Sequence, residues 1–144
     1  MISRAMALGI VGALVAVGAA FADDAVGFTL EITGVQVNRG QVYVRIYANE
    51  RDYKGDVPCA SYVLDSASES IVHSFDIAAG EYVISLFQDS NGNGKSDTNF
   101  LGMPREPVAL SNHTRGIPGG FSKLKIPITA AANKLTMNLR QIKQ

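Results

Sequence analysis

The residues with the clearest capacity for chemistry lie in one short segment, residues 89–97, which read DSNGNGKSD. Calcium takes about six to eight oxygen ligands, and a tight loop can supply several of them from alternate residues. In the register of an EF-hand calcium loop, Asp89, Asn91 and Asn93 occupy positions one, three and five. Lys95 can offer its backbone carbonyl at position seven, and Asp97 falls on position nine. The spacing therefore predicts a Ca²⁺ site formed by these residues.

The segment departs from an EF-hand at its far end. Phe100 stands at position twelve, where a bidentate glutamate normally completes the shell, and no helical pattern flanks the loop. Glu106 is the best candidate to complete the shell from outside. With so few carboxylates we expect weak binding, with a dissociation constant of roughly 10⁻⁴ to 10⁻³ M. We expect calcium rather than magnesium, because magnesium requires stricter octahedral geometry.

A second interpretation of the same segment needs no metal. Asn-Gly between alternating runs is the strongest short signal for a hairpin turn, and a strand pattern precedes it. The residues that follow, 95–99, have no apolar alternation and make a poor partner strand. A glycine turn also leaves Asp97 and the regular spacing unexplained. From the sequence, both interpretations stay open.

The chain begins with the pattern of an export signal. Arg4 precedes an apolar run over residues 5–20 that is shorter than a membrane span, and Ala20-Phe21-Ala22 supplies the small residues that signal peptidase reads. We expect residues 1–22 to be a cleaved signal peptide, with an uncleaved anchor as the alternative. Residues 23–144 are then a single periplasmic or secreted domain with no membrane span.

Composition narrows the classes of partner. The 13 Lys+Arg and 13 Asp+Glu residues balance and form no basic cluster, which gives no support for nucleic-acid binding. Cys59 is the only cysteine, so no internal disulfide can form. An exported domain of this kind must rely on its core, or on a metal, for stability.

The remaining sequence predicts strands. Apolar and polar residues alternate over seven segments, residues 28–33, 42–47, 61–64, 70–75, 78–88, 123–128 and 135–140. We expect the first two to form a hairpin, and Pro127 marks the sixth as an edge strand. The pattern predicts an all-β fold, a single β-sandwich of immunoglobulin-like or transthyretin-like topology, with a small barrel as the alternative. Residues 89–120 form one long polar loop within it.

The sequence does not indicate a catalytic site. His73 lies within a strand pattern, and Ser111, His113 and Asp97 could be grouped on paper as a triad. No nucleophile, zinc or phosphate-binding motif surrounds them. We expect no enzymatic activity, and a hydrolase is the remaining alternative.

Residues 80–112 resemble an exported bacterial family, the domain of unknown function 2141 family. Its pattern is G-x-Y-x-V, then D-x-N-x-N-G-x-x-D, then G-x-P-x-E-P and S-N. In this chain the pattern falls on residues 89–97 and on Gly80, Tyr82, Ile84, Gly102, Pro104, Glu106, Pro107, Ser111 and Asn112. Val108-Ala109-Leu110 replaces a usual aromatic-Gly-aromatic run, which argues against an aromatic ligand platform there. The resemblance implies an exported β-sandwich and no established activity.

Two classes of function fit these patterns. In the first, the protein is a non-enzymatic binding or accessory domain, in which calcium orders the loop and the loop holds a glycan, a peptide or another envelope or extracellular partner. The candidate polar contacts are Arg105, Asn112, His113 and Arg115. In the second, it is a structural or assembly protein of the cell envelope, with a metal-free glycine turn and an edge strand that pairs with a partner.

Overall fold

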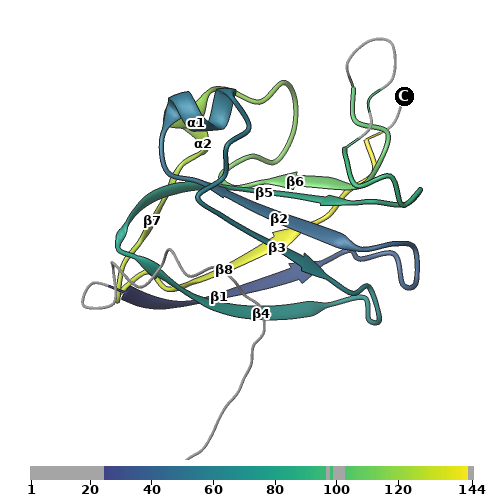
Figure 1. Cartoon of the computed structure of the whole chain (residues 1–144), viewed down its shortest axis with the longest axis horizontal. Coiled ribbons are helices and arrows are strands. Elements are labelled where there is room, and N and C mark those ends of the chain that lie inside the picture. Colours follow the sequence, from purple (N-terminus) through teal and green to yellow (C-terminus); the bar gives the residue numbers. More distant parts are fainter. Residues whose placement is uncertain (1–24, 97, 99–102, 143–144) are drawn as a thin grey trace, which may run out of the picture.

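The computed structural model describes residues 25–96, 98 and 103–142 (Figure 1). The signal peptide predicted at residues 1–22 lies outside these residues. The elements of the described part, in chain order, are β1 (Ala25–Thr33), β2 (Val42–Tyr47), α1 (Glu50–Lys54), β3 (Ala60–Leu64), β4 (Ile71–Ala78), β5 (Gly80–Gln88), β6 (Val108–Leu110), α2 (Phe121–Leu124), β7 (Ile126–Ile128) and β8 (Lys134–Asn138).

The strands form two sheets packed as a sandwich (Figure 1). One sheet has the order β4-β1-β8, in which β8 runs parallel to β1. The other has the order β3-β2-β5-β6, with β7 also paired to β5. The predicted all-β sandwich is confirmed, and β7, which contains Pro127, pairs only with β5 among the described strands, as an edge strand should.

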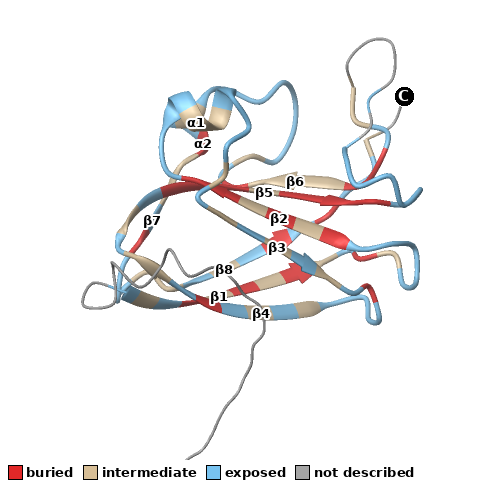
Figure 2. Cartoon of the chain, in the orientation of Figure 1, coloured by how far each residue is buried: buried red, intermediate tan, exposed pale blue. Residues whose placement is uncertain are grey.

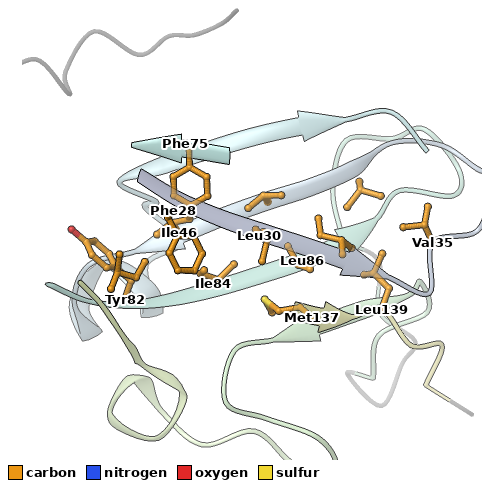
Figure 3. Packing of buried hydrophobic residues seen from close by; sticks show 14 residues of the cluster. Phe28, Leu30, Val35, Ile46, Phe75, Tyr82, Ile84, Leu86, Met137 and Leu139 are labelled. Carbon is orange, nitrogen blue, oxygen red and sulfur yellow. The ribbon is translucent and has the colours of Figure 1, made fainter. Parts of the chain in front are cut away.

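The core lies between the two sheets and follows the alternation of the sequence (Figure 2). Strands β1, β2 and β5 supply most of it, because every second residue on each faces inward. These inward residues are Phe28, Leu30, Ile32, Val42, Val44, Ile46, Tyr82, Ile84 and Leu86, and Figure 3 shows many of them packed together. Burial of each large side chain contributes about 1.5–3 kcal/mol.

The predicted hairpin between the first two strands is wrong. β1 pairs with β4 and β8, whereas β2 pairs with β3 and β5, so residues 34–41 cross from one sheet to the other. Each strand has one apolar face, and the two faces cover one another across the core instead of lying side by side. Val35 is buried within the crossing segment and belongs to the core cluster.

Two short helices were not expected from the sequence. Asn49 caps the N-terminus of α1, and its side-chain oxygen accepts the N–H of Asp52 at 2.8 Å. α2 occupies part of the segment predicted as a strand at residues 123–128, and within that segment the strand is limited to Ile126–Ile128. Helices of five and four residues are too short to show a helical period. Both fall far short of the length and apolar character of a membrane-spanning helix.

The helices cover one end of the outer face of the larger sheet (Figure 1). A second apolar cluster forms there from Tyr47, Val83 and Leu124, with Tyr53, Leu110 and Phe121 packed against it. Val83 is therefore fully buried although it faces away from the main core. This explains why the sequence of β5 is apolar on both faces.

His73 of β4 lies in an aromatic cluster on the side of the sandwich where β3 and β4 are the edge strands. Its ring centroid is 4.5 Å from that of Tyr62 and 5.7 Å from that of Phe75. Within the described residues its Nε2 atom is buried without a hydrogen-bond partner. This burial lowers the pKa of His73 from its ordinary value of 6.5, because a charged ring would lose its hydration.

This environment predicts acid-dependent stability. The unfolded chain takes up a proton at His73 near pH 6.5, whereas the folded chain resists it to lower pH, so stability is lost as the pH falls from 6.5 through the lower folded pKa. The free energy of unfolding of the wild type, measured with urea, should fall as the pH is lowered from about 7.5 to 5.5. His73→Phe should flatten this dependence, because it removes the buried ring whose protonation the fold opposes. An equal pH dependence in His73→Phe would refute the assignment.

Candidate functional site

The candidate loop starts at the buried end of β5. The side chain of Asp89, the first residue after the strand, is 2% exposed. One of its carboxylate oxygens accepts the backbone N–H of Gly94 at 2.7 Å, and the other accepts that of Asn93 at 3.2 Å. The chain therefore curls back over the Asp89 carboxylate.

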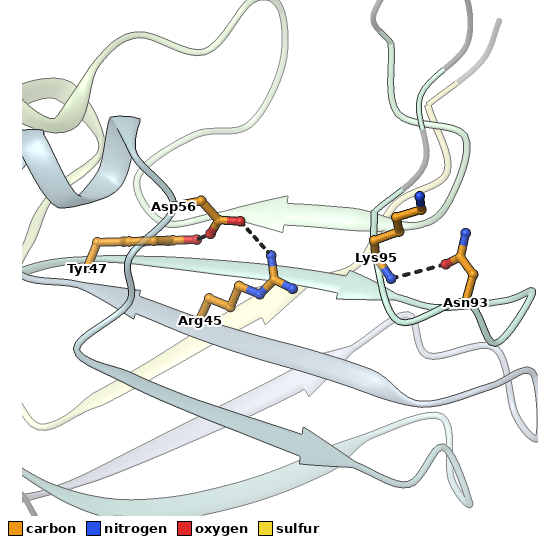
Figure 4. A network of polar contacts seen from close by, with 5 residues as sticks. All are labelled: Arg45, Tyr47, Asp56, Asn93 and Lys95. Atoms are coloured by element: carbon orange, nitrogen blue, oxygen red, sulfur yellow. Dashed lines mark hydrogen bonds and ion pairs between the residues drawn. The ribbon is translucent and has the colours of Figure 1, made fainter.

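The two asparagines continue this arrangement at alternate positions. Asn91 Oδ1 accepts the N–H of Asn93 at 3.2 Å, and Asn93 Oδ1 accepts the N–H of Lys95 at 3.1 Å (Figure 4). Both are the local turns that asparagine favours, with a side chain bonded to the backbone two residues on. Gly92 and Gly94 have φ values of 71° and 77°, which suit glycine. The oxygens of the three predicted side-chain ligands thus all contact backbone N–H groups of the loop.

Glu106 approaches the same loop from a position 16 residues after Ser90. It is 5% exposed, and its Oε2 accepts the N–H of Ser90 at 2.7 Å. The neighbouring backbone holds it there, because Gln88 donates its N–H to Pro107 at 2.9 Å and β6 begins at Val108. The segment expected as one long loop, residues 89–120, therefore contains the strand β6 after Glu106.

Asp97, the remaining predicted ligand, lies outside the described residues. Within the described residues no group of three or more His, Cys, Asp or Glu side chains converges as a metal site. The oxygens that accept backbone N–H groups of the loop are those of two carboxylates, Asp89 and Glu106, and the amide oxygens of Asn91 and Asn93. An all-oxygen set of this kind suits calcium rather than zinc.

Gln88 is a buried polar residue that the sequence reasoning missed. It is 0% exposed, its Nε2 donates to the carbonyl of Gln36 at 2.7 Å, and its Oε1 accepts the N–H of Gln36 at 2.9 Å. It fixes the segment between β1 and β2 against the end of β5. The available signal was its position, because residue 88 continues the inward alternation of Ile84 and Leu86.

The start of the loop is packed against the same crossing segment. Asp89 donates its N–H to Gln41 at 2.8 Å, and Gly40 has a φ of 85°. A Cβ atom on Gly40 would overlap the carbonyl oxygen of Asp89. Only glycine fits this contact, so the loop and the β1–β2 connection are fixed together.

The four predicted ligand-contact residues do not form one group in the described structure. Arg105 lines a cavity of about 460 Å³ beside the loop, together with Ser90, Asn91, Thr98 and Glu106. Asn112 instead donates its side-chain amide to the carbonyl of Lys123 at 3.0 Å, and His113 lies 3.2 Å from the carbonyl of Gly116. Arg115 is exposed on the same segment. Of these residues, only Arg105 lines the cavity beside the loop.

Ser111 has a structural position. It is 1% exposed, its Oγ accepts the N–H of Ile84 at 3.0 Å and donates to the carbonyl of Leu124 at 2.7 Å. The hydroxyl therefore joins β5 to the end of α2. Its hydrogen is directed at the carbonyl of Leu124 and not at His113.

A further polar group lies on the outer face of the larger sheet (Figure 4). Asp56 accepts the hydroxyl of Tyr47 at 2.5 Å and pairs with Arg45 at 3.2 Å. Burial, and then the bond to Asp56, raise the pKa of Tyr47, so the phenol stays protonated and donates. Arg45 also lies over the ring of Phe87, which stacks in parallel with the ring of Tyr43 at a centroid distance of 4.8 Å. The group fixes the end of α1 to the sheet.

Residues 30–136 match the model of the family described as "Uncharacterized protein conserved in bacteria", the domain of unknown function 2141 family. The chain belongs to this family. Searches of curated proteins and of solved structures found no match.

The positions of the family pattern have clear physical roles in this member of the 2141 family. A Cβ on Gly80 would lie 3.4 Å from the ring of Tyr82, and the Tyr82 hydroxyl donates to the carbonyl of Ala78 at 2.7 Å. A Cβ at that distance would be in ordinary van der Waals contact, so it is the hydrogen bond of Tyr82 that closes the β4–β5 turn. Ser111 and Asn112 hold α2 through Leu124 and Lys123, so both parts of the pattern fix the sandwich around the loop.

A pair of glycine substitutions tests the anchoring of the loop. Gly92→Ala adds a Cβ into open space at a positive φ, so it should cost about 1–2 kcal/mol of unfolding free energy. Gly40→Ala carries the same backbone strain and also overlaps Asp89, so it should cost about 2–5 kcal/mol. Chemical denaturation of both variants measures the difference. Equal losses would mean that the Gly40–Asp89 contact does not constrain the loop.

Proposed function

We propose that this protein is an exported, non-enzymatic binding domain that holds a calcium ion in the loop that begins at Asp89 and uses that loop to contact an envelope or extracellular partner. The observation that carries the proposal is that the side-chain oxygens of every second residue from Asp89 to Asn93 point into the loop. Those of Asp89, Asn91 and Asn93 all contact backbone N–H groups of the same short loop. A loop closed in this way can present several oxygens to one small cation.

The burial of two carboxylates supports the same proposal. Asp89 and Glu106 are each at least nine-tenths buried and both contact the first turn of the loop. Burial of a carboxylate is unfavourable unless hydrogen bonds or a cation compensate it. A carboxylate has about four acceptor positions, so the two N–H bonds to Asp89 leave acceptor capacity for a metal.

The polar cavity beside the loop supports a binding role. Its described lining consists of hydroxyl, amide, guanidinium and carboxylate groups, which suit a hydrophilic ligand such as a glycan or a polar peptide segment. Arg105 is its exposed positive group. Asn112, His113 and Arg115 remain candidate contacts for a larger partner that extends along the 111–120 segment.

Calcium titration of the full chain, purified as the cell processes it, tests the metal site. A calcium concentration about ten times the dissociation constant should raise the free energy of unfolding by about 1.4 kcal/mol relative to excess EDTA. Asp89→Asn and Glu106→Gln should each reduce this difference. Asp76→Asn removes an exposed carboxylate on β4 and is the matched control, which should retain the full difference.

A gain of affinity gives a second test. Asn91→Asp adds a charged oxygen ligand at position three and keeps the acceptor for Asn93, so it should lower the calcium dissociation constant measured by calorimetry. A wild type that shows no calcium-dependent stabilisation or heat, together with an inert Asn91→Asp variant, would leave a metal-free glycine turn and a structural protein. Loss of metal binding in Asp76→Asn would point instead to a nonspecific surface effect.

A further inference from the structure

Within its described residues the sandwich is closed on one side by backbone hydrogen bonds between the sheets, and it is open in this sense on the other side, where β3 and β4 meet through side chains such as Tyr62 and His73. On the closed side Val108 of β6 and Arg140 exchange two backbone hydrogen bonds of 3.0 Å, which join the larger sheet to the segment after β8. On the open side the outermost strands are β3 and β4, each paired with a neighbour along one edge. Figure 1 shows these two strands at the same side of the molecule.

Of the outer strands, β3 lacks the usual protection against pairing. Exposed edges are normally protected by charged residues, proline, a bulge or a very short strand. β7 contains Pro127, β6 has three residues, and β4 carries Asp76. β3 reads ASYVL, with no charge, no proline and no glycine, and its outward residue Val63 is 51% exposed.

We propose that β3 is a self-association edge at which a second copy of this chain pairs antiparallel about a two-fold axis, extending the larger sheet across the dimer. With Tyr62 opposite the partner's Tyr62, Ser61 lies opposite the partner's Val63, and Ala60 opposite the partner's Leu64. This register keeps inward residues facing inward on both copies, because side chains alternate along a strand. The main-chain N–H and C=O groups of the outer edge supply the hydrogen bonds.

The residues of β3 fit a second copy in size and charge. Each directly opposed pair joins a small residue to a larger one, apart from the tyrosines on the axis. No charged residue of the strand meets a like charge, whereas like charges directly opposite destabilise strand pairs. Ala60, Tyr62 and Leu64 are only half-buried although they pack against the core, so a second copy would cover apolar surface that the monomer leaves accessible.

Sedimentation and light scattering of the full chain over roughly 1 µM to 1 mM test the proposal, because a five-residue pairing is small beside a standard interface and should be weak. The wild type should shift from monomer to dimer with concentration. Ser61→Lys/Val63→Lys places lysines opposite one another in the proposed register and should raise the dimer dissociation constant at least about tenfold. Both positions are exposed, so the fold should survive.

Two further samples decide the outcome. Val72→Lys/Ser74→Lys adds the same charge to exposed positions of β4 and should dimerise like the wild type. A mixture of Ser61→Lys/Val63→Lys with Ser61→Glu/Val63→Glu should form a heterodimer, because opposite charges then face one another. A wild type that stays monomeric at 1 mM overturns the proposal. A dimer weakened equally by the β4 substitutions, or a mixture that stays monomeric, also overturns it.

Discussion

The structure around the loop depends on two buried polar residues that follow one another at the end of β5. A buried amide or carboxylate is costly unless its hydrogen bonds are made. Gln88 makes its bonds with the β1–β2 crossing, and Asp89 makes its bonds with the loop it begins. If either segment moved, Gln88 or Asp89 would lose hydrogen bonds while it stayed buried. The central strand thereby sets the conformation of two connections that are distant in sequence.

Most strands could be predicted because they have one apolar face, which the alternation of apolar and polar residues shows directly, whereas β5 is apolar on both faces. The alternation does not show which strands pair with one another, and for this reason the predicted β1–β2 hairpin is wrong. The two short helices could not be predicted from the sequence for another reason. Leu124 fitted the alternation of residues 123–128, yet it is buried in α2 against a small separate cluster. Only tertiary packing distinguishes these cases.

The contacts of the candidate site between residues close in sequence could be predicted, whereas those between residues distant in sequence could not. The side chains of Asp89, Asn91 and Asn93 each accept a hydrogen bond from a backbone N–H a few residues ahead. Contacts over so short a range can be inferred from the spacing of residues in the sequence. Glu106 was found from its chemistry and its nearness in sequence. The part played by Gly40 depends on a contact with residue 89 of another strand connection, and no local pattern contains it.

The same local bonds bear on how a cation would be held. Asp89, Asn91 and Asn93 make hydrogen bonds within the loop, so the backbone sets the conformations of the side chains that a cation would contact. A preorganised site loses little conformational freedom on binding, so its affinity is limited mainly by ligand charge and number. Calcium should then stabilise the domain with little change in its shape. A loop of this kind suits a support for a binding surface better than a conformational switch, because its two states would differ too little to signal.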